Sequence, residues 1–159
     1  MKNLTKPLIA AATAISVSTG VVANADQHAD RKKIEMVLAT YEKALNASDT
    51  DTVMTLYDDD GVFMPQHSMP NVGKKAVRVA YENVFKAIKL DIDFTVDEIV
   101  QISPTWAFAR TRSNGFVTIN ATGNKGPEAN QELFVFQKQD DRDWKIARYI
   151  FSTTNPPRQ

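Results

Sequence analysis

The chain has 159 residues, of which 19 are basic and 19 acidic, and it contains no cysteine. The balanced charge does not suggest a nucleic-acid-binding protein. The lack of cysteine excludes disulfides, thiol catalysis and cysteine-ligated metals. The two histidines, His28 and His67, lie far apart without an HExxH motif, so we expect no dedicated metal site.

Residues 1–25 have the three parts of a secretory signal peptide. Two lysines precede an apolar run over 8–22, and Ala23-Asn24-Ala25 supplies the small residues of a cleavage site. The run is short and rich in Ala, Ser and Thr, which disfavours a membrane-spanning helix, although an uncleaved anchor is the alternative. We expect a secreted or periplasmic bacterial protein whose single mature domain covers 26–159 and has no membrane contact after cleavage.

Removal of Lys2 and Lys6 with the signal peptide leaves 17 basic residues against 19 acidic ones, a net charge of −2. The mature chain then begins with helical patterns. Apolar spacing predicts helices over about 30–47, over a short stretch after Asp49 or Asp51, and over about 74–88.

Aspartates mark the ends of these first helices. Asp30 is a plausible N-cap of the first helix, and Asp49 or Asp51 of the second. The run 58–61, three aspartates and a glycine, predicts a helix stop and a turn. Consecutive carboxylates point in different directions, so we interpret this run as a solvated turn and not as a metal cluster.

Period-two alternation begins after Lys89 and predicts a sheet. The expected strands cover 62–64 and then about 90–102, 105–118, 130–139 and 144–153. Helices followed by strands indicate an α+β fold with the helices on one face of a mostly antiparallel sheet.

The strand at 105–118 has two different faces. One carries large or charged side chains (Trp106, Phe108, Arg110, Arg112, Phe116), and the other carries Ala107, Ala109, Thr111 and Ser113. The small side chains favour the second set as the inward one, but the pattern leaves both orientations open. Both faces of the sheet are substantially apolar, so we expect a homodimer through one sheet face. The alternative is a monomer in which loops shield Trp106 and Trp144.

Three segments carry a resemblance to a known superfamily: LYDDDGVFMP at 56–65, GKKAV at 73–77 and WKIARYIF at 144–151. In order and spacing they resemble the SnoaL-like, ketosteroid-isomerase-like (nuclear-transport-factor-two-like) proteins, and most closely the SgcJ/EcaC-type branch. The resemblance covers nearly all of 29–156. It implies a conical half-barrel, in which three helices pack on a curved sheet around a mainly apolar pocket.

The resemblance also implies where a ligand binds. The candidate ligand-binding residues are Tyr41, Met64, Phe85, Arg112, Phe134 and Tyr149. Core packing is the alternative for each aromatic residue. Arg112 would bind a carboxylate or enolate if its strand face is concave, and would lie in the dimer interface if that face is convex.

Glu132 and His67 are the candidate catalytic residues. Met64 occupies the place where ketosteroid isomerases carry their aspartate base, so the sequence departs from that pattern. Glu132 falls near the place of their neutral oxyanion-binding aspartate. It precedes an apolar run, which is compatible with a raised pKa, but the sequence favours the other interpretation, an ordinary cross-strand pair with Arg110, Arg112 or Arg148. His67 lies in the loop near the implied pocket mouth and is otherwise an exposed loop residue.

Two functions remain open from the sequence. The first is an exported protein that binds a small apolar or aromatic ligand, with cofactor-free lyase or isomerase chemistry. The second is a non-catalytic dimeric binding or accessory module in the periplasm. A buried, unpaired Glu132 in a roomy pocket favours the first, whereas a Glu132 bonded to an arginine beside a filled cavity excludes catalysis. Met64 in the place of the base favours the second. Fold by itself does not decide between them.

Overall fold

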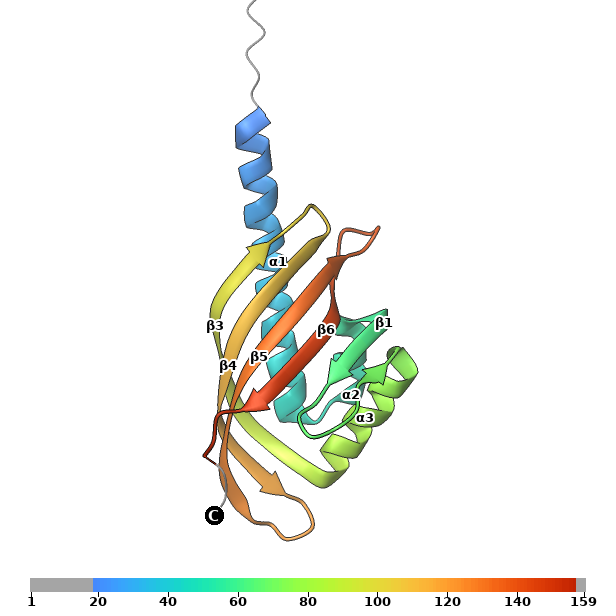
Figure 1. Cartoon of the computed structure of the whole chain (residues 1–159), viewed down its shortest axis with the longest axis vertical. Coiled ribbons are helices and arrows are strands. Elements are labelled where there is room, and N and C mark those ends of the chain that lie inside the picture. Colours follow the sequence, from blue (N-terminus) through green and yellow to red (C-terminus); the bar gives the residue numbers. More distant parts are fainter. Residues whose placement is uncertain (1–18, 157–159) are drawn as a thin grey trace, which may run out of the picture.

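The computed structural model describes residues 19–156, with side chains from Asp26 onward (Figure 1). Most of the predicted signal peptide lies outside these residues, and its cleavage stays a prediction. The elements are α1 (Thr19–Ala47), α2 (Thr50–Leu56), β1 (Tyr57–Met64), β2 (Asn71–Val72), α3 (Lys74–Ala87), β3 (Ile88–Gln101), β4 (Trp106–Ile119), β5 (Lys125–Lys138) and β6 (Trp144–Thr153). Within the described part of the chain, no helix is both long and apolar enough to cross a membrane.

The strands form one six-stranded sheet in the order β2-β1-β6-β5-β4-β3. β1 and β6 run parallel, and the other neighbours are antiparallel. Figure 1 shows α1 along the inner face of the curved sheet, with α2 and α3 beside β1. The predicted α+β class, with three helices on a curved, mostly antiparallel sheet, is confirmed.

The sheet bends at irregular positions in its long strands. The pairing of β3 with β4 shifts between Val96 and Glu98, and the pairing of β5 with β6 shifts between Val135 and Phe136. Bulges of this kind increase local twist. In β4, Gly115 has a φ of 156°, and a Cβ atom there would lie 2.1 Å from the Asp91 carbonyl oxygen. Only glycine allows β3 and β4 to approach so closely.

Several predicted boundaries were wrong. α1 begins at Thr19, so Asp30 lies inside the helix and is not its N-cap. The predicted turn at 58–61 is part of β1, which bulges between Tyr57 and Val62. β2 was not predicted, and β5 begins at Lys125. Asp49 was correctly expected as a cap: its Oδ1 accepts from the Thr52 backbone N–H at 3.0 Å.

Asp30 instead connects α1 to the sheet. Its side chain is buried and accepts hydrogen bonds from Lys138 Nζ at 2.7 Å, Trp144 Nε1 at 3.1 Å and Gln101 Nε2 at 3.2 Å. Burial alone would raise the pKa of Asp30, but the hydrogen bonds and the charge of Lys138 outweigh burial and lower it. The cluster therefore holds α1, β3, β5 and β6 together through one carboxylate.

We predict that Asp30→Asn lowers the free energy of unfolding by about 3 kcal/mol at pH 7, because it leaves Lys138 buried without its counter-charge. The control is Asp91→Asn. Asp91 faces Lys125 at 3.4 Å with 76% of its side chain exposed, and an exposed pair contributes at most about 1 kcal/mol. Urea unfolding measures the free energy of unfolding of each variant. Equal decreases in Asp30→Asn and Asp91→Asn would contradict the prediction.

Candidate functional site

A row of polar side chains lies on the inner face of β4 and β5. Thr111 pairs with Glu132, and Ser113 pairs with Asn130, across the two strands. All four residues are buried. Because residues two apart share a strand face, they line up on the side that packs against the helices. The small residues of β4 were correctly favoured as the inward set.

Glu132 accepts hydrogen bonds from three hydroxyl groups. Thr111 Oγ1 donates to Oε2, Ser113 Oγ donates to Oε1 at 2.9 Å, and the Tyr149 hydroxyl donates to Oε1 at 3.3 Å. The residue is 5% exposed, and no cation contacts it among the described residues. The site therefore holds a carboxyl group in a neutral, hydroxyl-lined environment.

Burial raises the pKa of Glu132, and the negative charge of Glu128 adds to this effect. The hydrogen bonds from Thr111, Ser113 and Tyr149 lower this pKa, but they offset only part of the increase caused by burial. The alternative of a cross-strand pair between Glu132 and an arginine is wrong. A buried carboxyl whose pKa is shifted by its surroundings is a candidate proton-transfer group.

The arginines lie on the outer face. Arg110 Nη1 and Arg112 Nη2 contact Asp97 at 2.7 and 2.9 Å, and Arg110 Nε contacts Glu98 at 2.9 Å. The bulge in β3 allows both consecutive acids to reach these arginines, and the hydrogen bond from Arg112 lowers the pKa of Asp97. Arg112 therefore does not line the inner face, which corrects its place in the predicted ligand-binding set.

Three buried tyrosines, from α1, β1 and α3, form a hydrogen-bonded group in the core. The Tyr81 hydroxyl of α3 lies 2.5 Å from that of Tyr41 and 3.0 Å from that of Tyr57. Burial raises the pKa of all three well above the usual value. They are neutral hydrogen-bond donors throughout the physiological pH range. Gly61 makes room for the group, because a Cβ atom there would lie 2.8 Å from the Tyr57 ring.

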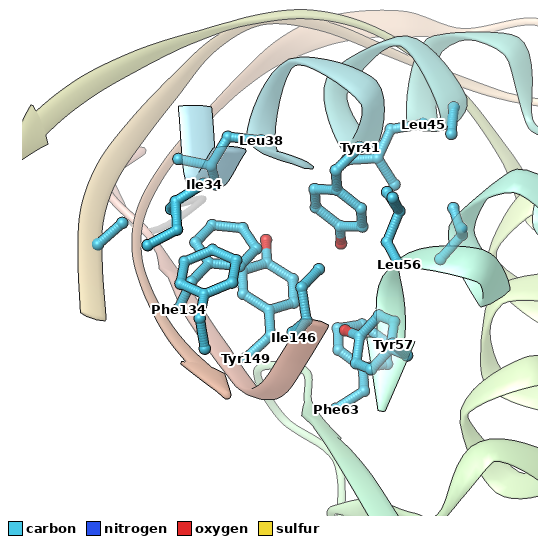
Figure 2. Close-up of a cluster of buried hydrophobic side chains, with 14 of the residues drawn as sticks. Ile34, Leu38, Tyr41, Leu45, Leu56, Tyr57, Phe63, Phe134, Ile146 and Tyr149 are labelled. Atoms are coloured by element: carbon cyan, nitrogen blue, oxygen red, sulfur yellow. The ribbon is translucent and has the colours of Figure 1, made fainter. Parts of the chain in front are cut away.

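Aromatic rings fill the space between α1 and the sheet. Figure 2 shows Tyr41 reaching from α1 toward Phe134 and Tyr149 of the strands. Its ring centroid lies 5.5 Å from each of theirs, and these two stack at 4.2 Å. The predicted ligand-binding residues Tyr41, Phe134 and Tyr149 are thus brought together, with each at most 3% exposed. Their rings serve as core packing, and the Tyr149 hydroxyl also reaches Glu132.

Half-buried phenylalanines surround this core. Phe85 lies 5.8 Å from Tyr81, Phe94 lies 6.0 Å from Tyr41, and Phe151 lies 5.8 Å from Tyr149, between ring centroids. Met64, at the end of β1, is also half-buried. We call Met64, Phe85, Phe94 and Phe151 the aromatic rim. These four side chains are only partly buried, unlike the rings of the core.

His67 is exposed in the loop after β1 and has a φ of 58°. None of the side-chain hydrogen bonds found within residues 26–156 involves it. The structure therefore does not bring His67 into contact with Glu132. Over the same range, no three His, Asp or Glu side chains gather in a way that could hold a metal ion.

Asn130 is the member of the inner row that sequence reasoning missed. Its Nδ2 atom donates to Glu128 Oε1 at 2.8 Å and to Ser113 Oγ at 3.3 Å. The signal was available, because Asn130 stands two residues before Glu132 in a strand with period-two alternation. Two further side chains, Thr111 and Ser113, were placed inward but not connected to Glu132.

Residues 37–149 match the SnoaL-like domain family. The chain belongs to this family. A ketosteroid isomerase-like protein of Erwinia carotovora atroseptica is 37% identical, with a TM-score of 0.76 over 79% of this chain and 96% of that one. The expected superfamily is thereby confirmed, whereas the SgcJ/EcaC-type branch stays a prediction.

More distant structures share the fold. A proposed scytalone dehydratase of Novosphingobium aromaticivorans is 17% identical, with a TM-score of 0.73 over 83% of this chain and 89% of that one. A hexachlorocyclohexane dehydrochlorinase is 10% identical, with a TM-score of 0.74 over 83% and 90% of the two chains. A search of the curated proteins found no significant match.

We predict that Glu132→Gln changes the pH dependence of the stability of the SnoaL-like domain, with the stability of the variant rising relative to wild type toward alkaline pH. Since the folded-state pKa of Glu132 is raised, the folded protein binds the extra proton. Wild-type stability should therefore fall, relative to the variant, as pH rises from the unfolded-state pKa through the raised folded-state pKa.

Urea unfolding at a series of pH values measures this difference. Glu98→Gln is the control, because Glu98 is a partly exposed carboxylate on the outer face. A Glu132→Gln difference that is the same at every pH would contradict a raised pKa.

Proposed function

We propose that this SnoaL-like protein binds a small apolar or aromatic compound at the aromatic rim and performs cofactor-free acid–base chemistry on it through Glu132. The observation that carries the proposal is the Glu132 carboxyl, which is 5% exposed and bonded only to hydroxyl groups. A carboxyl in such an environment costs stability when it ionises. Groups of this kind are typical of sites that transfer protons.

The hydroxyl donors suit Glu132 to the role of base. In the carboxylate form it accepts three hydrogen bonds and can take a proton from a carbon next to a carbonyl group of the ligand. The electron pair left on carbon then forms a double bond and expels a leaving group on the next carbon. Glu132 returns the proton to a leaving hydroxide, so a β-hydroxy ketone gives an enone and water. Isomerisation returns the proton to another carbon instead.

Support for elimination also comes from the names of two structural neighbours, a dehydratase and a dehydrochlorinase. Both names describe loss of a small molecule with formation of a double bond. Ketosteroid isomerases use an aspartate base together with a tyrosine and a neutral aspartate as oxyanion donors. With Met64 in the place of that base, we assign proton abstraction to Glu132, the buried carboxyl of the inner row. Assignment to the SgcJ/EcaC-type branch is part of this proposal.

A panel of aromatic β-hydroxy ketones, such as 4-hydroxy-4-phenylbutan-2-one, tests the reaction by the absorbance of the enone product. We predict that Glu132→Gln lowers the rate at least about 100-fold, the usual contribution of a general acid or base. Glu98→Gln should leave the rate unchanged. Turnover that survives in Glu132→Gln would exclude Glu132 as the base, and no turnover across the panel would favour the second candidate.

The second candidate is a non-catalytic binding or accessory module. Two observations favour it: aromatic rings pack closely between α1 and the sheet, and Met64 cannot take up a proton. In this case the compounds bind without being converted, and Glu132→Gln changes affinity alone.

We further propose that the protein works outside the cytoplasm as a homodimer that pairs through the outer sheet face. On that face Leu133 and Ile150 are neighbours across β5 and β6, and they are 41% and 44% exposed. A shallow groove of about 430 Å³ runs beside them, flanked by Arg110 and Arg112. An apolar centre with a charged border is typical of interfaces between subunits.

Native mass spectrometry of protein extracted from a bacterial periplasm tests export and pairing together. We predict a dimer of chains that begin at Asp26, and a monomer for Leu133→Asp, because two buried carboxylates would face each other across the interface. Val79→Asp on α3 is the control for an exposed apolar residue away from the sheet face. A full-length chain would contradict cleavage, and a wild-type monomer would contradict pairing.

A further inference from the structure

The orientation of the Asn130 side-chain amide is set by Glu128. Nδ2 donates to Glu128 Oε1 at 2.8 Å and to Ser113 Oγ at 3.3 Å. A carboxylate only accepts hydrogen bonds, so the NH₂ group and not the carbonyl oxygen must face Glu128. Ser113, which accepts from Asn130, then directs its own proton to Glu132.

This orientation leaves the Asn130 carbonyl oxygen without a donor. Asn130 is 7% exposed, and Oδ1 has no hydrogen-bond partner among the described residues. Most buried polar atoms in native proteins are paired, and an unpaired acceptor costs stability. A donor supplied by a bound molecule would remove that cost.

Asn130 also occupies the right place for a ligand contact. It is two residues from Glu132 on the same face of β5, and Ser113 joins the two side chains by hydrogen bonds. A ligand group bonded to Asn130 is therefore separated from Glu132 by a single side chain, that of Ser113. Gln101 Oε1 is a second unpaired acceptor in the described chain, but it lies beside the Asp30 cluster and far from the inner row in sequence.

We propose that Asn130 Oδ1 accepts a hydrogen bond from a hydroxyl or N–H group of the ligand. The ligand class is then an apolar ring compound that carries a hydrogen-bond donor, and Asn130 is the residue that selects it. This inference rests on the proposed binding of a small apolar compound. A site built to pair with a donor discriminates against compounds that lack one, because its buried acceptor stays unpaired.

Indole and benzofuran form a matched pair of probes. They share size and shape, but indole presents an N–H donor where benzofuran has an oxygen atom. We expect wild-type protein to bind indole about three- to tenfold more tightly than benzofuran, the effect of one hydrogen bond. Ligand-observed NMR measures both dissociation constants.

Asn130→Leu keeps the size of the side chain and removes the acceptor. The variant should bind indole and benzofuran equally, with its affinity for benzofuran not reduced. Asn130→Ala is the second variant, should Asn130→Leu fail to fold. Asn114→Leu is the control, because Asn114 is an exposed asparagine of β4 and should keep the wild-type preference.

The outcomes separate this inference from the proposed function. If wild type binds both probes equally, or Asn130→Leu keeps the preference for indole, the role of Asn130 is wrong while small-molecule binding stands. If neither probe binds up to its solubility limit, the binding function and the role of Asn130 both fail. A preference for indole that disappears in both Asn130 variants but not in Asn114→Leu supports the inference.

Discussion

The long strands curve around α1, and the site depends on that curvature. Each bend has a local cause: the extra residue in β3, the shifted pairing of β5 and β6, and Gly115 where β4 approaches β3. A flat sheet could not bring Tyr149 of β6 and Phe134 of β5 against Tyr41 of α1. Curvature also gives the sheet its two distinct faces, one with hydroxyl groups around Glu132 and one with ion pairs.

The inner face combines two environments that oppose each other. Aromatic rings exclude water, which raises the pKa of Glu132, while Thr111, Ser113 and Tyr149 stabilise its ionised form. Burial outweighs these hydrogen bonds, so the pKa of Glu132 is raised. The same packing limits the space near Glu132, and the proposed ligand contacts the partly exposed side chains of the aromatic rim. Both candidate functions share that surface and differ in whether Glu132 moves a proton.

Two clusters of buried polar groups on the sheet have different roles. The Asp30 cluster is fully charge-balanced, joins four elements and is best understood as structural. The row that contains Glu132 and Asn130 has no counter-charge in the described residues and has an acceptor left unpaired. Proteins tolerate such local costs mainly where a function requires them. This contrast is the physical reason to place the site on the inner row.

The sequence by itself determined the family, the α+β class and most element spans, because apolar periodicity is a local property that each helix and strand displays independently. It also placed Thr111 and Ser113 inward, since small residues alternate there. Only the tertiary structure decided that Glu132 bonds to hydroxyl groups and not to arginines. One extra residue at Asp97 aligns two acids with Arg110 and Arg112, and such a bulge leaves no periodic signal. The period-two pattern already places Asn130 on the face of Glu132, but only the structure shows that its carbonyl oxygen lacks a partner among the described residues, because hydrogen bonds between distant residues leave no local signal.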